Sequence, residues 1–285
     1  MVAPSEINYD NLTTTDKITL GSGASFVNLK YNDQMCLLKL PKTTCFGVDT
    51  FEDPKTSEKK STMTIQFKKE QMENDESVKN AVEGLQEFEK YIKKWAKENS
   101  QELFKKKSVS TDFIDAIFNP ILKPSKNKDT EEPDDRYNTM KLKLKPSKKD
   151  DTKFDCGAFT SSKEKMNITK DNVSDLIKKW SEVKVVITPN IWIISGKIGV
   201  SWNLWQVKYW EPKGGVVIKE VNKTITVLVY CKLDGFEEYK YNYHKNKLMI
   251  GVKLPNTKYF IASGKSKKEA EQNAALECLK NINKK

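Results

Sequence analysis

The sequence predicts an α+β protein: a β-rich core with inserted helices, followed by a small module that combines helices and strands. Three observations support this fold class. Short apolar runs alternate with Gly, Asn and Asp over 17–51, 62–67 and 183–209, as in strands joined by turns. Residues 76–98 place their apolar side chains in one wedge of a helix. Near the end of the chain, apolar residues recur at helical spacing over 267–282.

The segments between these elements are assigned from their composition. Residues 1–16 are polar, and we expect them to form a flexible N-terminus. Two shorter helices are predicted at 111–118 and 171–180. Residues 124–136 are highly charged and contain two prolines, so we expect a loop there.

Charge is unevenly placed along the chain. The net charge is +11, and residues 213–285 hold 15 lysines against 7 acidic residues. Residues 1–212 hold 35 basic and 32 acidic residues, so the C-terminal part is the more general binder of polyanions. We place a first domain at 17–212, a linker at 213–221 and a second domain at 222–285.

Residue usage argues against an enzyme. His244 is the only histidine, which disfavours His-based triads and metal sites with several histidines. The phosphate-binding glycine-rich motif of nucleotide hydrolases is absent from the sequence. An acidic cluster at 129–135 is better explained as a solvated loop than as a metal site. We therefore expect no catalytic residue, no metal and no cofactor.

The sequence also indicates the cellular compartment and the kind of contact that the protein can make with nucleic acid. Five widely spaced cysteines without CxxC spacing indicate reduced thiols of an intracellular protein. We find no apolar run long enough to cross a membrane and expect no membrane partner. Arg136 is the only arginine, so bidentate reading of guanine is nearly absent. Lysine contacts to phosphates and aromatic stacking are favoured over sequence reading.

A lysine row is predicted on one strand, at 140–145. Side chains alternate across a strand, so Met140, Leu142 and Leu144 are expected to face the core. The opposite side then carries Lys141, Lys143 and Lys145. Such a row can follow a phosphate backbone. It is equally typical of a solvated strand face that resists aggregation.

Four of the six tryptophans lie in 190–210, in a strand region with expected breaks at 189–190 and 195–196. Strict alternation puts Trp202 on one face with Leu204, and Trp205 on the other with Val207 and Tyr209. Aromatic rings among lysines suit stacking on unpaired bases. The alternative is that most of these rings belong to the core. The residues predicted to contact a single strand are Lys141, Lys143, Lys145, Trp192, Lys197, Trp202, Trp205, Lys208 and Tyr209.

The C-terminal stretch Gly264 to Ala275 carries three lysines at or before a helix start. Ser266 and Glu269 have capping-box spacing, and a helix N-terminus with lysines favours phosphate. This run resembles the last helix of the double-stranded-RNA-binding domain family. The resemblance implies an α-β-β-β-α module, with 222–233 in the place of the first helix, although those residues are themselves typical of a strand. The candidate duplex contacts are His244, Lys245, Lys265, Lys267 and Lys268. The alternative is a module that keeps the fold and binds protein.

The first part of the chain carries a second resemblance, over 17–210. Its most specific part is Ile191-Trp192-Ile193 followed by the run 197–208. Supporting segments are Cys45-Phe46-Gly47-Val48, the helix ending near Trp95, Asn119 to Lys123, the strand 141–145 and Phe154-Asp155-Cys156. Together these segments resemble the phage-type single-stranded-DNA-binding proteins of nucleocytoplasmic large DNA viruses. The resemblance implies an oligonucleotide-binding β-barrel with helical insertions.

Three functional hypotheses follow from the sequence. The first is a viral protein that binds single-stranded DNA without sequence preference in replication or recombination, with a fused duplex-binding tail. Its expected partners are single-stranded DNA, double-stranded RNA and viral replication proteins, in the host cytoplasm (viral factory) or nucleus. The second is a double-stranded-RNA-binding decoy that hides viral RNA from host sensing. The third is a structural or packaging protein whose two domains bind other proteins.

Overall fold

The protein is described by a computed structural model over residues 1–52, 59–126, 132–211, 216–221, 224–229, 238–244, 247–253, 259–264 and Asn273. The chain divides into two units, Met1–Trp210 and Glu211–Lys285. The division falls beside the predicted end of the first domain. In the part of the chain that the structure describes, the first unit contains the extended sheet and the helices named below, and the second contains a separate sheet and the helical residue Asn273.

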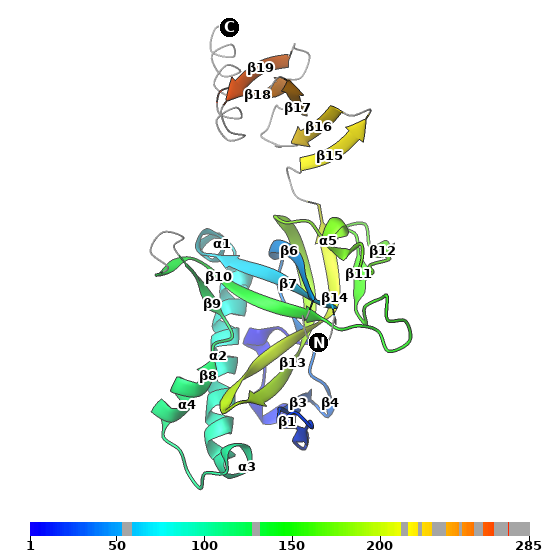
Figure 1. The fold of residues 1–285 in the computed structure, drawn as a ribbon. Helices are drawn as coiled ribbons and strands as arrows, with labels where there is room; N and C mark the ends of the chain where they lie inside the picture. The colour runs from blue at the N-terminus through cyan, green and yellow to red at the C-terminus, as the bar shows by residue number, and fades with distance from the viewer. Residues whose placement is uncertain are drawn as a thin grey trace. The chain divides into compact units, whose positions relative to one another are not determined.

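In the described part of the first unit, five strands close into a barrel (Figure 1). They are β6 (Thr43–Glu52), β7 (Lys59–Lys68), β10 (Pro133–Leu144), β13 (Ser181–Ile194) and β14 (Lys197–Trp210). The hydrogen-bonded order is β13–β6–β7–β10–β14, and β14 pairs back with β13. All of these pairings are antiparallel except that of β10 with β14, which is parallel. This is the five-stranded barrel of the oligonucleotide-binding fold, which confirms the predicted fold class.

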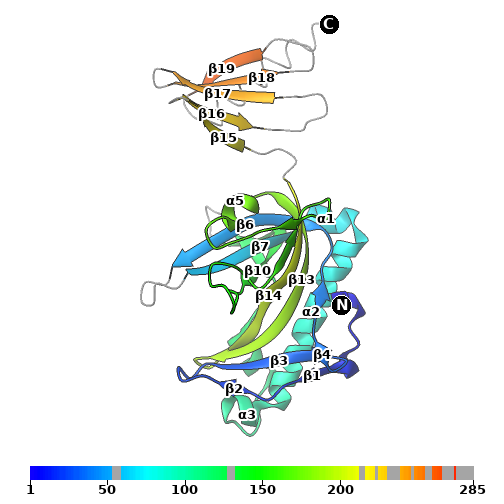
Figure 2. The same cartoon turned by 90° about the vertical axis from the view of Figure 1, so that its right-hand side faces the viewer.

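Helices are inserted between the barrel strands. Four of the described helices lie between β7 and β10, and a fifth precedes β13: α1 (Lys69–Asn74), α2 (Glu76–Glu98), α3 (Ser100–Phe104), α4 (Thr111–Ile117) and α5 (Val173–Leu176). The structure confirms the predicted helix at 76–98. Asp75 caps it by accepting a hydrogen bond from the Ser77 backbone N–H at 2.9 Å. Helix α2 runs along one side of the long β13–β14 hairpin (Figure 2), and its Phe88 ring lies 5.6 Å from that of Trp202.

Short strands extend the sheet beyond the barrel. The N-terminal ones are β1 (Leu12–Thr14), β2 (Ile18–Thr19), β3 (Ser25–Tyr31), β4 (Gln34–Met35) and β5 (Leu38–Lys39). The later ones are β8 (Phe118–Asn119), β9 (Lys123–Lys126), β11 (Gly157–Phe159) and β12 (Lys165–Met166). Strand β3 pairs with β13 over Asn190 to Ile193, beyond the part of β13 that pairs with β6. The long hairpin therefore joins the barrel at one end and the N-terminal strands at the other.

The prediction of a flexible N-terminus is wrong. Residues 1–16 form two 3-10 helices, η1 (Pro4–Glu6) and η2 (Tyr9–Asn11), and strand β1, which pairs with β3. Pro4 is buried against α2, and the Tyr9 ring stacks on that of Tyr91 at 4.6 Å. The segment is mostly polar, so its composition did not indicate that Pro4 and Tyr9 pack against the rest of the unit.

Gly84 of α2 fixes the contact with the N-terminal segment. A Cβ built there would lie 2.4 Å from the backbone carbonyl carbon of Pro4. Replacing a glycine inside a helix by alanine normally raises the free energy of unfolding by about 0.5–1 kcal/mol. Gly84→Ala is instead expected to lower the free energy of unfolding and to expose residues 1–16 to protease, as measured by urea denaturation and limited proteolysis. Glu83→Ala, on the exposed side of the same turn, is the control. A gain in stability at Gly84 would contradict the tight contact.

Three other local predictions need correction. The segment 124–136 contains the ends of β9 and β10, which pair through Pro133 and Lys126 although both are in charged surroundings. The helix predicted at 171–180 is reduced to α5. No break occurs at Pro189, because β13 continues through it and Pro189 lies opposite Trp202 in register. The break at Ser195 and Gly196 is confirmed: both have positive φ, as a tight hairpin turn requires.

A β-bulge at Trp205 overturns the predicted faces of β14. Val186 pairs with Gln206 and Ile187 with Leu204, so Trp205 is an extra residue without a partner on β13. The extra residue shifts the alternation by one position. Val207 and Tyr209 are consequently buried on the same side as Leu204, while Trp205 is 43% exposed. The prediction that Val207 and Tyr209 share a face with Trp205 is therefore wrong.

The second unit holds a five-stranded antiparallel sheet among its described residues. Its strands are β15 (Val216–Val221), β16 (Thr224–Val229), β17 (Glu238–His244), β18 (Lys247–Lys253) and β19 (Tyr259–Gly264). The three consecutive strands β17, β18 and β19 are those of the predicted module. Placing a first helix at 222–233 is wrong over 224–229, where β16 pairs with β15. Strand β15 also occupies most of the predicted linker. The last predicted helix lies outside the described residues, apart from Asn273, which is helical.

Candidate nucleic-acid interface

A groove crosses the outer face of the barrel, where β7 and β10 meet the long hairpin. Its first part encloses about 570 Å³ and its second part about 500 Å³. Both parts are lined by Asn28, Lys145, Asn190 and Asn203, so they form one continuous depression, called the groove below. In this fold, the face of the second and third barrel strands, here β7 and β10, is the side that binds oligonucleotides.

Lysines line the barrel side of the groove. Alternation on β10 buries Met140, Leu142 and Leu144, which confirms the predicted direction of this strand. The exposed Lys143 lies beside Thr62 of β7 and Asn203 of β14 in register. The lysines that line the groove are Lys30, Lys59, Lys60, Lys143, Lys145 and Lys148, and Asp155 is the one carboxylate among its described lining residues.

The lysines of the groove repel one another. The pKa of Lys143 is lowered, first because neighbouring protein removes part of its hydration, and then because Lys145 and Lys60 are close. A bound phosphate would relieve this repulsion, since it brings negative charge to the point where the cations crowd. The lysine row therefore gathers positive charge at one place in the groove, as an anion site requires.

Aromatic side chains also line the groove. The bulge directs Trp205 outward, where it lines the second part. Phe26 of β3 lines the first part and lies opposite Trp192 of β13 in register. The Trp192 ring packs over Gly199, where an added Cβ would lie 2.7 Å from the indole. The Trp205 and Phe26 rings thus offer flat apolar surfaces in the same groove as the lysines, which is the combination that holds unpaired bases.

Three asparagines from adjacent strands form the floor of the groove. The Asn190 side-chain N–H donates to the Asn28 Oδ1, and the Asn203 N–H donates to the Asn190 Oδ1. The three amides thus fix each other across β3, β13 and β14. Asn203 is buried, so the half-buried Asn28 and Asn190 are the amides that can meet polar edges of any base, and amide donors and acceptors do not select one base.

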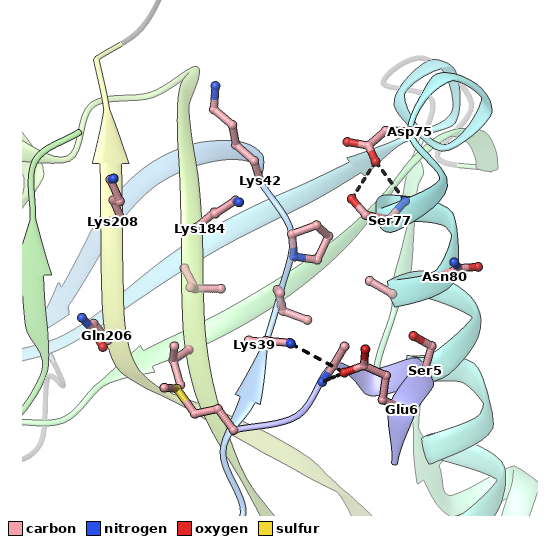
Figure 3. Close-up of a pocket in the computed structure, with 17 residues that line it drawn as sticks. Ser5, Glu6, Lys39, Lys42, Asp75, Ser77, Asn80, Lys184, Gln206 and Lys208 are labelled. Atoms are coloured by element: carbon pink, nitrogen blue, oxygen red, sulfur yellow. Dashed lines mark hydrogen bonds and ion pairs between the residues drawn. The ribbon is translucent and has the colours of Figure 1, made fainter. Parts of the chain in front are cut away.

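The structure brings three of the nine predicted single-strand residues together in the groove: Lys143, Lys145 and Trp205. Lys141 is exposed on the same side of β10, and Lys197 is exposed beside the hairpin turn. Trp192 is half-buried on the outer face. Lys208 lies in a different hollow (Figure 3).

Two of the predicted contacts are wrong. Trp202 is 2% exposed and Tyr209 4% exposed, and both side chains pack in the core. Neither ring can stack on a base without unfolding of the barrel. Their burial is the outcome that the core interpretation of this tryptophan-rich segment predicted.

Of the predicted duplex contacts, only His244 is among the residues that the structure describes. His244 ends β17, opposite Lys247 at the turn into β18. Lys245, Lys265, Lys267 and Lys268 lie outside the described residues.

Sequence reasoning missed several groove residues: Phe26, Asn28, Lys30, Lys59, Lys60, Lys148, Asn190 and Asn203. They come from four strands and one loop that are far apart in the chain, and no short motif joins them. The one local signal was the alternation in β3, where Phe26, Asn28 and Lys30 share a face.

Within the described parts of the chain, no group of three or more His, Cys, Asp and Glu side chains is arranged to hold a metal ion. No helix among those residues combines the length and apolar character needed to span a membrane.

Comparisons with known proteins match both parts of the chain. Residues 230–282 match the family model described as "Double-stranded RNA binding motif". A 42-residue segment is 60% identical to Ribonuclease 3 of Pelagibacter ubique (strain HTCC1062), covering 15% of this chain and 19% of that protein. The chain therefore spans about a fifth of the length of this curated relative.

Solved structures of two phage proteins are similar to most of the chain. One is a single-stranded DNA-binding protein from bacteriophage Enc34 in complex with single-stranded DNA. The two sequences are 11% identical, the similarity covers 70% of this chain and 95% of that chain, and the TM-score is 0.37. The other is gp2.5, a single-stranded DNA binding protein encoded by bacteriophage T7, with 15% identity, 66% and 96% coverage, and a TM-score of 0.37. The chain thus combines a barrel of the oligonucleotide-binding fold with a C-terminal segment that matches the double-stranded RNA binding motif.

Proposed function

We propose that the first unit binds single-stranded nucleic acid in the groove, without sequence preference. The observation that carries this proposal is the meeting of Lys143, Lys145 and Trp205 in one depression. The lysines hold phosphates, and Trp205 with Phe26 stacks on bases. The scarcity of arginine fits contacts to the backbone better than the reading of bases.

DNA is the preferred ligand in this proposal, and its setting is the replication or recombination of a large DNA virus. The support is the resemblance of 17–210 to phage-type single-stranded-DNA-binding proteins, carried chiefly by the run through Trp202 and Trp205. The role is binding and not catalysis, because a single histidine and the lack of a nucleotide-hydrolase motif leave few routes to an active site.

Trp205 provides the direct test. In the full chain, Trp205→Ala is expected to weaken binding of oligo(dT) by about 1–3 kcal/mol, the usual contribution of one base–aromatic stack. Fluorescence quenching by oligo(dT) should fall in parallel, while the unfolding transition stays close to that of the unsubstituted protein. Trp180→Ala is the matched control, because Trp180 is 57% exposed and lines neither part of the groove. Equal affinity in the two variants would rule out stacking on Trp205.

The second unit supports a second candidate function, the binding of double-stranded RNA. The specific observation is the match of 230–282 to the double-stranded RNA binding motif. In this case the protein serves as a decoy that hides viral RNA from host sensing. Oligonucleotide competition at physiological salt separates the two: the single strand should be the stronger competitor for the full chain in the first case, and an RNA duplex of equal length should be the stronger in the second.

A further inference from the structure

A second hollow collects lysines on the outer side of the sheet (Figure 3). It encloses about 680 Å³. Lys208 of β14, Lys184 of β13, Lys42 and Lys39 line its sheet side, and the start of α2 lines the other side. Lys39, Lys184 and Lys208 lie on β5, β13 and β14, and Lys42 lies just before β6, so four cations line one side of the hollow.

Among the described residues, two of these lysines form ion pairs with carboxylates and two do not. Lys39 lies 3.6 Å from a Glu6 carboxylate oxygen, and Lys42 forms an ion pair with Glu182. Among the described residues, neither Lys184 nor Lys208 makes an ion pair. Asp75 caps α2 through Ser77, and the positive charge of Lys184 across the hollow helps to lower the pKa of this carboxyl without forming an ion pair with it.

Lys184 and Lys208 stand directly opposite each other in the β13–β14 ladder. Like charges in this position destabilise a pair of strands. The Lys208 ammonium lies 5.1 Å from the Trp210 ring centre, a contact that leaves its positive charge in place. A like-charge pair that faces an open hollow is the arrangement expected where an anion is bound.

The hollow and the groove lie along the same face of β13. Burial alternates without interruption along this strand, so Lys184, Thr188 and Asn190 point to one side. Thr188 and Asn190 line the groove, and Lys184 lines the hollow. Thr188 lies four positions after Lys184 along the strand, a distance of about 13 Å. On β14, the bulge places Trp205 in the groove and the next residue, Gln206, in the hollow.

We propose that a single strand bound in the groove continues past Trp205 and sets its phosphate groups on Lys184 and Lys208. This inference rests on the function proposed above for the groove. Trp205 then marks the passage between two segments of the site and not its end. A short strand fills the groove alone, and only a longer strand reaches the lysine pair.

The test compares oligo(dT) lengths from about 4 to about 16 nucleotides, the range of site sizes for one barrel of this fold. The full chain is measured beside a variant that combines Lys184→Gln and Lys208→Gln. The shortest strand should bind both proteins equally. The longest strand should bind the variant more weakly than the unsubstituted protein. The slope of log K against log salt should also be shallower for the variant by about 1.4, because each lost phosphate contact removes about 0.7. The control combines Lys94→Gln and Lys107→Gln, two exposed lysines outside the groove and the hollow.

Each other outcome contradicts either the proposed function of the groove or the proposed path of the strand. If the unsubstituted protein binds no single strand, the proposed function fails. If it binds and the double variant matches it at every length, the groove stands and the continued path is wrong. Equal weakening at the shortest and longest lengths also contradicts the path. Loss of binding to an oligo-glutamate peptide, with oligo(dT) binding intact, would assign the pair to an acidic protein partner instead.

Discussion

Trp202→Ala is expected to destabilise the barrel by about 3–5 kcal/mol, the usual cost of truncating a large buried aromatic residue. Trp202 is 2% exposed and packs against Phe88 of α2 at a ring-centre distance of 5.6 Å. It also lies in register with Leu142 of β10, at the parallel pairing that closes the barrel. The substitution therefore opens a cavity where helix and barrel meet.

Urea denaturation followed by circular dichroism measures the effect. Trp205→Ala serves as the matched control, because it removes the same side chain three positions away from a site that is 43% exposed. The two substitutions should separate cleanly: the first lowers stability, and the second lowers affinity for oligo(dT). If both variants lost similar stability, the placement of Trp205 outside the core would be wrong.

The second large effect concerns three groove lysines together. Replacing Lys60, Lys143 and Lys145 by glutamine should remove about three phosphate contacts, making the salt dependence of oligo(dT) binding shallower by about 2. Extrapolated from 1 M to 0.15 M salt, this corresponds to a loss of about 50-fold in affinity. At 1 M salt the variant and the unsubstituted protein should bind almost equally.

Arginine at the same three positions is the control, since it keeps each charge while changing the shape of the donor. A salt titration of both variants by fluorescence anisotropy checks the prediction. If the glutamine variant kept the original slope, the phosphates would have to be held elsewhere, with the C-terminal unit as the obvious place.

Features set by local periodicity could be predicted from the sequence. Helix α2 has a continuous apolar wedge and an aspartate cap at Asp75, so both its existence and its bounds followed from neighbouring residues. The lysine row of β10 likewise followed from strict alternation over six residues. In both cases each local preference agrees with the packing of the whole unit.

The groove could not be predicted, because its walls are assembled by pairings between distant strands. Asn28 and Asn190 are 162 positions apart, yet their side chains hydrogen-bond across β3 and β13. In the second unit the resemblance suggested a helix over 222–233, while the β-branched residues favoured a strand. Residues 224–229 form strand β16, as their β-branched side chains favour, and pairing with β15 provides hydrogen bonds for the backbone.

The bulge makes Trp205 an extra residue of β14, without a partner in the ladder. Substitution at this position changes one lining residue of the groove and keeps the phase of β14. Deletion of the same codon would leave Leu204 and Gln206 paired as they are now, in a regular ladder, so Val207 and Tyr209 would stay in the core. In genetic terms, β14 can lose one codon at the bulge without exchanging its faces, whereas the loss of one codon from a regularly paired part of the strand would exchange them.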